Sequence, residues 1–147
     1  MNKEVLSIIN EEFEMVPESF GGEKEIYEVR KAEDILGTKL PKDYVEFICM
    51  FGCGVVGTTV ILGLGEAQFV STPSFVEETL KFRRELSSKY EKIVIIGVDG
   101  AGNPIGFNSP NEEIILYDHN LGEKVFLASN FSEYLKKACY DEVNIQF

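Results

Sequence analysis

Basic residues are scarce in this sequence, and their scarcity excludes several kinds of partner. Fourteen Lys and Arg stand against twenty-five Asp and Glu, so the formal net charge is −11 and the pI is about 4.6. Proteins that bind nucleic acids neutralise phosphates with clustered Lys and Arg, which argues against direct DNA or RNA binding here. An anionic membrane surface is disfavoured for the same reason. The charge favours a basic protein partner, although acidity that serves solubility alone is the simpler alternative.

Cysteine and histidine are also few. The three cysteines, Cys49, Cys53 and Cys139, lie among apolar residues. This setting favours buried, reduced thiols in the cytoplasm over a disulfide scaffold. A structural zinc ion takes four nitrogen or sulfur ligands, so Cys49 and Cys53 with the distant His119 form an incomplete set. We therefore expect no metal site.

The sequence has no long hydrophobic run. Its longest apolar-rich segment, residues 55–64, contains two glycines and two threonines and is far shorter than the roughly 20 residues that span a bilayer. The first sixteen residues have no continuous apolar stretch of the kind found in signal peptides. We expect a cytoplasmic protein without a transmembrane helix.

Apolar residues, in contrast, are plentiful. They make up 44% of the 147 residues and aromatic residues 12%, which is ample material for a hydrophobic core. A chain of this length buries roughly 70% of its extended surface when it folds. We expect residues 1–147 to form a single domain.

The first third of the chain is predicted to be helical. In residues 6–16, 26–36 and 41–51, apolar side chains recur every three or four positions, as on the buried face of a helix. Gly37 is expected to end the second helix, and Pro41 suits the first turn of the third.

The remainder is predicted to contain mainly strands. A helix is expected from Ser74, which stands at capping-box spacing from Glu77, and a last helix from Asn130. The expected strands are residues 58–64, 92–98, 105–108, 113–117 and 124–127. Short turns between successive strands favour an antiparallel meander, and helices followed by strands are typical of the α+β class.

Several short motifs occur in an order that resembles a known family. ILG at residues 35–37 is followed by LPKDYVEFI at 40–48 and FGCG at 51–54, then by VILGLG, IVIIGVDGAGN and IILYDHNLGEKVFLASNFSEYL. This order resembles the SMI1/KNR4 (SUKH) superfamily from about Ile26 to Leu135. The chain departs from the family pattern where Gly52-Cys53-Gly54 replaces a common Asn-Gly, and where Tyr117 replaces a common Trp.

The resemblance implies an α+β fold with a mostly antiparallel or mixed sheet packed with helices. It also implies a binding protein without catalysis, because bacterial members are best known as immunity proteins that neutralise toxin domains, many of them nucleases. An acidic protein could occupy the basic face of a nuclease as a substrate mimic. The alternative is a regulatory or scaffolding domain, with or without a small ligand in a groove beside the sheet. Whether the protein is a monomer or a dimer stays open.

If the function is binding, acidic surface residues are the candidates for contacting the basic toxin. The candidates open the helix that follows Ser74, occupy turns beside strand ends, or follow the last helix: Glu77, Glu78, Asp99, Asp118, Asp141 and Glu142. Tight inhibitors combine such charges with aromatic anchors, for which Tyr90, Tyr117 and Tyr140 are available. The alternative for each acid is that it is simply solvated or, for Glu77, caps a helix.

Catalytic and cofactor sites are not indicated. Asp118 could orient His119 as a general base, but no serine nucleophile motif accompanies the pair, and a hydrogen bond within a turn is the better interpretation. The glycine-containing turn at 99–103 lacks the phosphate-loop pattern and carries one carboxylate, too few for calcium. We expect no cofactor.

Overall fold

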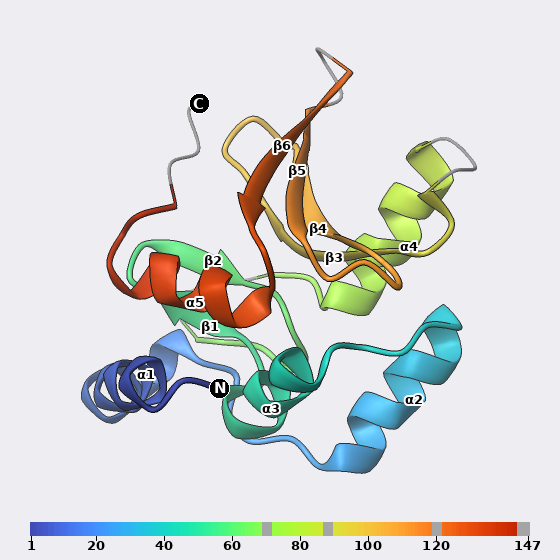
Figure 1. Cartoon of the computed structure of the whole chain (residues 1–147). Helices are drawn as coiled ribbons and strands as arrows, with labels where there is room; N and C mark the ends of the chain where they lie inside the picture. Colours follow the sequence, from blue (N-terminus) through green and yellow to red (C-terminus); the bar gives the residue numbers. More distant parts are fainter. Residues whose placement is uncertain (69–71, 87–89, 119–121, 144–147) are drawn as a thin grey trace.

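A computed structural model describes residues 1–68, 72–86, 90–118 and 122–143 (Figure 1). Within these ranges the chain forms five α-helices, one short 3-10 helix and two antiparallel sheets. In chain order the elements are α1 (Lys3–Met15), η1 (Pro17–Ser19), α2 (Ile26–Leu36), α3 (Lys42–Phe51), β1 (Gly54–Val56), β2 (Thr59–Ile61), α4 (Phe75–Glu85), β3 (Ile93–Val98), β4 (Pro104–Asn108), β5 (Ile114–Asp118), β6 (Glu123–Ala128) and α5 (Phe131–Cys139). None of the described helices is both long and apolar enough to cross a bilayer.

The larger sheet is the predicted antiparallel meander, with strand order β3-β4-β5-β6. Its strands follow one another in sequence, as short connections require. Helix α4 packs on β3, and α5 follows β6 directly and lies beside the β1–β2 hairpin (Figure 1). The α+β class is thereby confirmed.

The smaller sheet corrects the prediction of one long strand over residues 58–64. The segment is half of a hairpin in which Val56 pairs with Thr59, and β1 was not foreseen. The glycines around β1 indicated only a helix end. Gly57 makes the tight turn possible because its φ is +61°, a left-handed conformation that favours glycine. A Cβ there would also meet the carbonyl oxygen of Ala138 at the end of α5.

The LPKDY motif connects three parts of the fold. Tyr44 is fully buried, and its hydroxyl donates to the carbonyl of Leu62 at 2.6 Å. Its ring packs edge-on against Phe131 of α5 at 4.8 Å between centroids. One carboxylate oxygen of Asp43 accepts hydrogen bonds from the N–H and the hydroxyl of Ser132, at 3.0 and 2.7 Å. The motif therefore attaches α3 to the start of α5 and to the segment after β2.

Arg83 joins α4 to two other elements through hydrogen bonds to two backbone carbonyls and a hydroxyl. Its Nε donates to the carbonyl of Ile93 at 2.9 Å, and its two terminal nitrogens reach the carbonyl of Leu36 at 2.7 Å and the hydroxyl of Thr38 at 3.3 Å. The bond to Leu36 satisfies a carbonyl at the end of α2 that has no partner within the helix. The planar guanidinium, which donates in several fixed directions, thus holds α4 against β3 and α2.

Glu33 is a buried carboxylate that depends on two donors. Its oxygens accept from the N–H of Leu40 at 2.8 Å and from Arg30 at 2.6 Å, and the side chain is 4% exposed. Burial by itself raises the pKa of this carboxyl, but the hydrogen bonds from Leu40 and Arg30 outweigh it, so the pKa lies below its ordinary value of 4.5. The ionised form therefore stabilises the link between α2 and α3.

The Glu33 carboxylate predicts a pH-dependent contribution to stability. Because its pKa is lowered on folding, its contribution is present above the unfolded value near 4.5 and is lost as the pH falls through the folded value. At about pH 7, Glu33→Gln should lower the free energy of unfolding by about 1–3 kcal/mol, the usual range for a hydrogen bond to a charged group. Urea unfolding of both proteins at about pH 7 and about pH 3.5 checks this. A difference that stays constant between the two pH values would contradict it.

Candidate functional site

The six acidic candidates lie in three separate places. Glu77 and Glu78 occupy the first turn of α4. Asp99 and Asp118 follow or end β3 and β5, which run in the same direction, so both lie at one end of the larger sheet. Asp141 and Glu142 follow α5 (Figure 1). A partner that contacts all three places must cover a broad surface.

Two of these acids hold turns together. Asp99 accepts hydrogen bonds from the N–H of Ala101 at 3.0 Å and the N–H of Asn103 at 2.7 Å, which closes the β3–β4 turn. Asp141 accepts from the N–H of Thr58 at 3.0 Å and from its hydroxyl at 3.2 Å, which fastens the end of α5 to the β1–β2 turn. Both carboxylates therefore stabilise turns of the fold, in addition to any contact with a partner.

The other four acids differ in exposure. Glu77 and Glu142 are exposed, whereas Glu78 and Asp118 are half-buried. The N–H of Glu77 donates to the Ser74 hydroxyl at 3.2 Å, as the capping spacing predicted, and this bond leaves the Glu77 carboxylate on the surface. Asp118 stands opposite Glu123 in the β5–β6 pair.

The aromatic anchors are only partly available. The sequence left open which of the three tyrosines is exposed, and Tyr117 is not available as a surface anchor, because it is 5% exposed and packs edge-on against Tyr90. Burial raises the pKa of Tyr117 to about 12, and the charge of the neighbouring Tyr90 makes a smaller contribution in the same direction. Tyr140 is 43% exposed, with its hydroxyl hydrogen-bonded to Glu4. His119 lies outside the described residues, so its predicted turn role stays a prediction.

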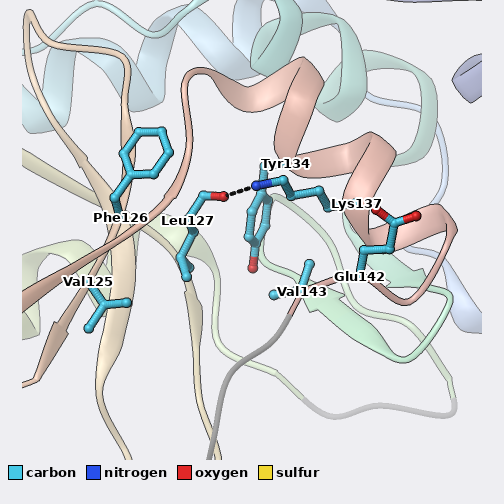
Figure 2. Close-up of a pocket in the computed structure, with 7 residues that line it drawn as sticks. All are labelled: Val125, Phe126, Leu127, Tyr134, Lys137, Glu142 and Val143. Carbon is cyan, nitrogen blue, oxygen red and sulfur yellow. Dashed lines mark hydrogen bonds between the residues drawn. The ribbon is translucent and has the colours of Figure 1, made fainter.

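A cavity between β6 and α5 was not foreseen from the sequence. Its volume is about 210 Å³, and it opens beside the segment that follows α5 (Figure 2). Seven residues from these three elements line it: Val125, Phe126, Leu127, Tyr134, Lys137, Glu142 and Val143.

The hydroxyl of Tyr134 is the unusual group in this cavity. The side chain is 1% exposed, and its oxygen is the one buried side-chain polar atom without a hydrogen-bond partner among the described residues. Burial raises the pKa of Tyr134 above its ordinary value, so the hydroxyl stays protonated at neutral pH. Figure 2 shows it pointing to the space between Leu127 and Val143. A buried hydroxyl of this kind costs free energy until a polar group reaches it.

Lys137 forms the polar wall of the cavity. Its ammonium donates to the carbonyl of Leu127 at 2.6 Å (Figure 2). The ammonium also lies 3.5 Å from a carboxylate oxygen of Glu133. Ile114 pairs with Ala128 and Ile115 with Phe126, so Leu127 is the extra residue of a β-bulge. The lysine thus satisfies a carbonyl at this irregular place and ties α5 to β6.

The middle of β6 exposes two large apolar side chains. Val125 is 43% and Phe126 53% exposed. Adjacent residues of a strand point to opposite faces, so neither face of β6 is covered here. The sequence predicted a strand over residues 124–127 and did not say which of its side chains are buried. No local signal in the sequence shows that Val125 and Phe126 stay exposed.

A second hollow lies between α2 and α4. It is larger, about 540 Å³, and is lined by Lys24 and Lys31 together with Tyr27 and Ile35, which are 67% and 54% exposed. Among the described residues, no buried unpartnered polar atom points into it. It is an exposed groove with a mixed apolar and charged lining, which includes Glu28.

The cysteines are free thiols, in agreement with the sequence. Burial raises the pKa of Cys49, Cys53 and Cys139, that of Cys139 to about 11, which keeps them protonated and weakly nucleophilic. In the described part of the chain, no group of three or more His, Cys, Asp or Glu residues is arranged to hold a metal ion.

The architecture and the motifs agree with a comparison against protein families. A search of curated proteins found no significant match. The family description "SMI1 / KNR4 family (SUKH-1)" matches residues 26–137, from the start of α2 into α5. The matched segment includes LPKDY, whose Asp43 and Tyr44 join α3 to α5 and to the segment after β2. With about three quarters of its length matched, the chain belongs to the SMI1/KNR4 family (SUKH-1).

Proposed function

We propose that this protein is a non-catalytic immunity protein that binds and neutralises a cognate bacterial toxin domain. The observation that carries the proposal is the family match over residues 26–137, because immunity proteins are the best-known bacterial members of this superfamily. We propose further that residues 1–147 act as one binding domain. The buried apolar side chains of helices and sheets form one continuous cluster, which supports this.

The charge defines the partner more closely. A net charge of −11 attracts a basic surface and speeds its association. A nuclease must present such a surface to hold its substrate, so a basic nuclease domain is the toxin that fits best. The protein would then cover the substrate-binding face and exclude nucleic acid. The three free cysteines fit the reducing cytoplasm, where a toxin of this kind acts.

Six carboxylates are proposed to contact the toxin: Glu77, Glu78, Asp99, Asp118, Asp141 and Glu142. Exposed Glu77 and Glu142 can reach a partner without loss of a fold-stabilising contact. Contacts by Asp99 and Asp141 must leave their turn hydrogen bonds in place. Charges of this kind mainly raise the association rate, whereas buried apolar contacts hold the complex together.

A regulatory domain with a small ligand is the second candidate. The enclosed Tyr134 hydroxyl favours it, because small-molecule sites combine apolar walls with a few directed polar groups. Under this alternative the protein would need neither a toxin nor a basic partner.

Recovery of the partner from the native cells tests the proposed function. The tagged full chain should retain one basic protein at about 50 mM salt and much less at about 500 mM, because salt screens exposed charges. That protein should be toxic when expressed alone and harmless when this chain is co-expressed. Recovery of several housekeeping proteins, or co-expression without protection, would contradict the proposal.

A further inference from the structure

We propose that strand β6 and the cavity beside it form the docking site for an extended, basic segment of the partner protein. The segment would lie along β6 as an added strand and place one uncharged, hydrogen-bond-accepting side chain in the cavity. This inference rests on the proposed function: the partner is the same basic protein, and β6 with its cavity is the surface at which it docks.

The position of β6 supports the added strand. It is an edge strand of the larger sheet, with β5 on its one paired side among the described strands. An edge strand presents backbone N–H and C=O groups that a further strand can pair with. Phe126 and Val125 lie on opposite faces of β6 and are both half exposed, so an added strand would cover apolar surface on both faces.

The cavity supports an inserted side chain. The Tyr134 hydroxyl is enclosed, points into the cavity and has no partner (Figure 2). Lys137 offers a further N–H from the same wall, since an ammonium has three donors and is seen bonded to Leu127 with Glu133 nearby. Two donors select an acceptor, and the carboxylates of Glu133 beside Lys137 and of Glu142 in the lining favour an uncharged one. The apolar Leu127 and Val143 select a side chain with a hydrocarbon stem. A glutamine has this chemistry, with a carbonyl oxygen at the end of two methylene groups.

The charges around β6 support a basic segment. Exposed carboxylates stand at both ends of the site, Glu123 at the start of β6 and Glu142 at the cavity. Asp118, which pairs with Glu123 across β5 and β6, and Glu133, 3.5 Å from the Lys137 ammonium, balance the positive charges of Lys124 and Lys137. Lysine or arginine residues that flank the inserted side chain would therefore meet acidic groups.

Synthetic peptides provide the test. The first is an eight-residue peptide in which Gln alternates with Lys or Arg; a second replaces every Gln with Ala, and a third replaces every basic residue with Glu. Alternate residues of a strand point to the same face, so a Gln lies over the cavity in every second alignment of the peptide with β6. Each peptide is titrated into the isotope-labelled full chain while backbone amide and Tyr134 ring signals are followed by NMR. The first peptide should give saturable shifts in residues 123–128 and at Tyr134, and the acidic peptide should not.

A double-mutant cycle locates the side chain. Tyr134→Phe should weaken the Gln peptide by about 3- to 10-fold, the range for one hydrogen bond, and leave the Ala peptide unchanged. Phe126→Ser should weaken both peptides by about 5-fold or more through lost apolar contact. Ile35→Ser is the matched control, because Ile35 is 54% exposed and Phe126 53%, and it should change neither affinity.

The docking site is overturned by no shifts in β6, by equal binding of the acidic peptide, or by a Tyr134→Phe effect of equal size on the Gln and Ala peptides. Equal affinity of N-acetyl-glutamine amide alone would show a small-ligand cavity without strand pairing. These outcomes are independent of the toxin, since the peptides need none. If co-expression protects cells but Phe126→Ser protects equally well, the immunity function stands and this docking site is wrong.

Discussion

Gly63→Ala should lower the free energy of unfolding by about 3 kcal/mol or more and can prevent folding altogether. Gly63 is buried just after β2. An added Cβ would overlap the carbonyl oxygen of Gly52. Both backbones are held at this place, because the N–H of Leu64 donates to the Gly52 carbonyl at 2.9 Å and the N–H of Phe75 to the Gly63 carbonyl at 3.0 Å. Relief of the overlap would break these bonds.

Gly102→Ala is the matched control for this substitution. Gly102 has a φ of +85°, but nothing lies within 4 Å of the position of an added Cβ. Its cost should be about 1–2 kcal/mol, from the left-handed conformation alone. Urea unfolding of both variants measures the difference. A smaller loss for Gly63→Ala than for Gly102→Ala would show that the backbone around Gly52 yields more easily than its hydrogen bonds suggest.

Removal of one hydroxyl should lower stability at one buried tyrosine and not at another. The Tyr44 hydroxyl donates to the Leu62 carbonyl at 2.6 Å, so Tyr44→Phe should lower the free energy of unfolding by about 1–3 kcal/mol. The Tyr134 hydroxyl has no partner, so Tyr134→Phe removes a desolvated polar group and should change stability little or raise it by up to about 1 kcal/mol. Both side chains are at most 1% exposed, so the two substitutions are closely matched.

Thermal and urea unfolding of the two variants check this pair. If Tyr134→Phe destabilises as much as Tyr44→Phe, the Tyr134 hydroxyl has a partner in solution, such as a bound water. The comparison also separates folding from binding. A variant that folds at least as well as the wild type but binds the Gln peptide less tightly identifies the hydroxyl as a binding group.

The helices could be predicted from the sequence because their signals are local. Apolar spacing placed α2 and α3 within a residue or two, and Gly37 ended α2 as expected, with a φ of +64°. Ser74 and Asn130 cap α4 and α5 through their side-chain oxygens. Each of these features depends on residues within one or two helical turns, which a single sequence displays.

The β1–β2 hairpin could not be predicted as readily. Its strands have three residues each, and its turn depends on the close approach of Gly57 to Ala138 and Asp141 at the end of α5. Residues more than eighty positions apart meet there. The hydrogen bonds of Asp43 to Ser132 are of the same kind, since their partners are distant in sequence.

The acidic net charge and the family motifs can be read from residue types and their order, and they carry the proposal of a basic protein partner. The place of contact depends on which side chains the packing leaves exposed. The sequence did not show that Val125 and Phe126 stay half exposed or that Tyr117 is buried, and the packing decides both. The packing of β6, α5 and the segment after α5 leaves β6 at an edge, its apolar side chains exposed and the Tyr134 hydroxyl without a partner. Contacts between residues this far apart in the sequence leave no pattern among neighbouring residues, so only the tertiary structure decides them.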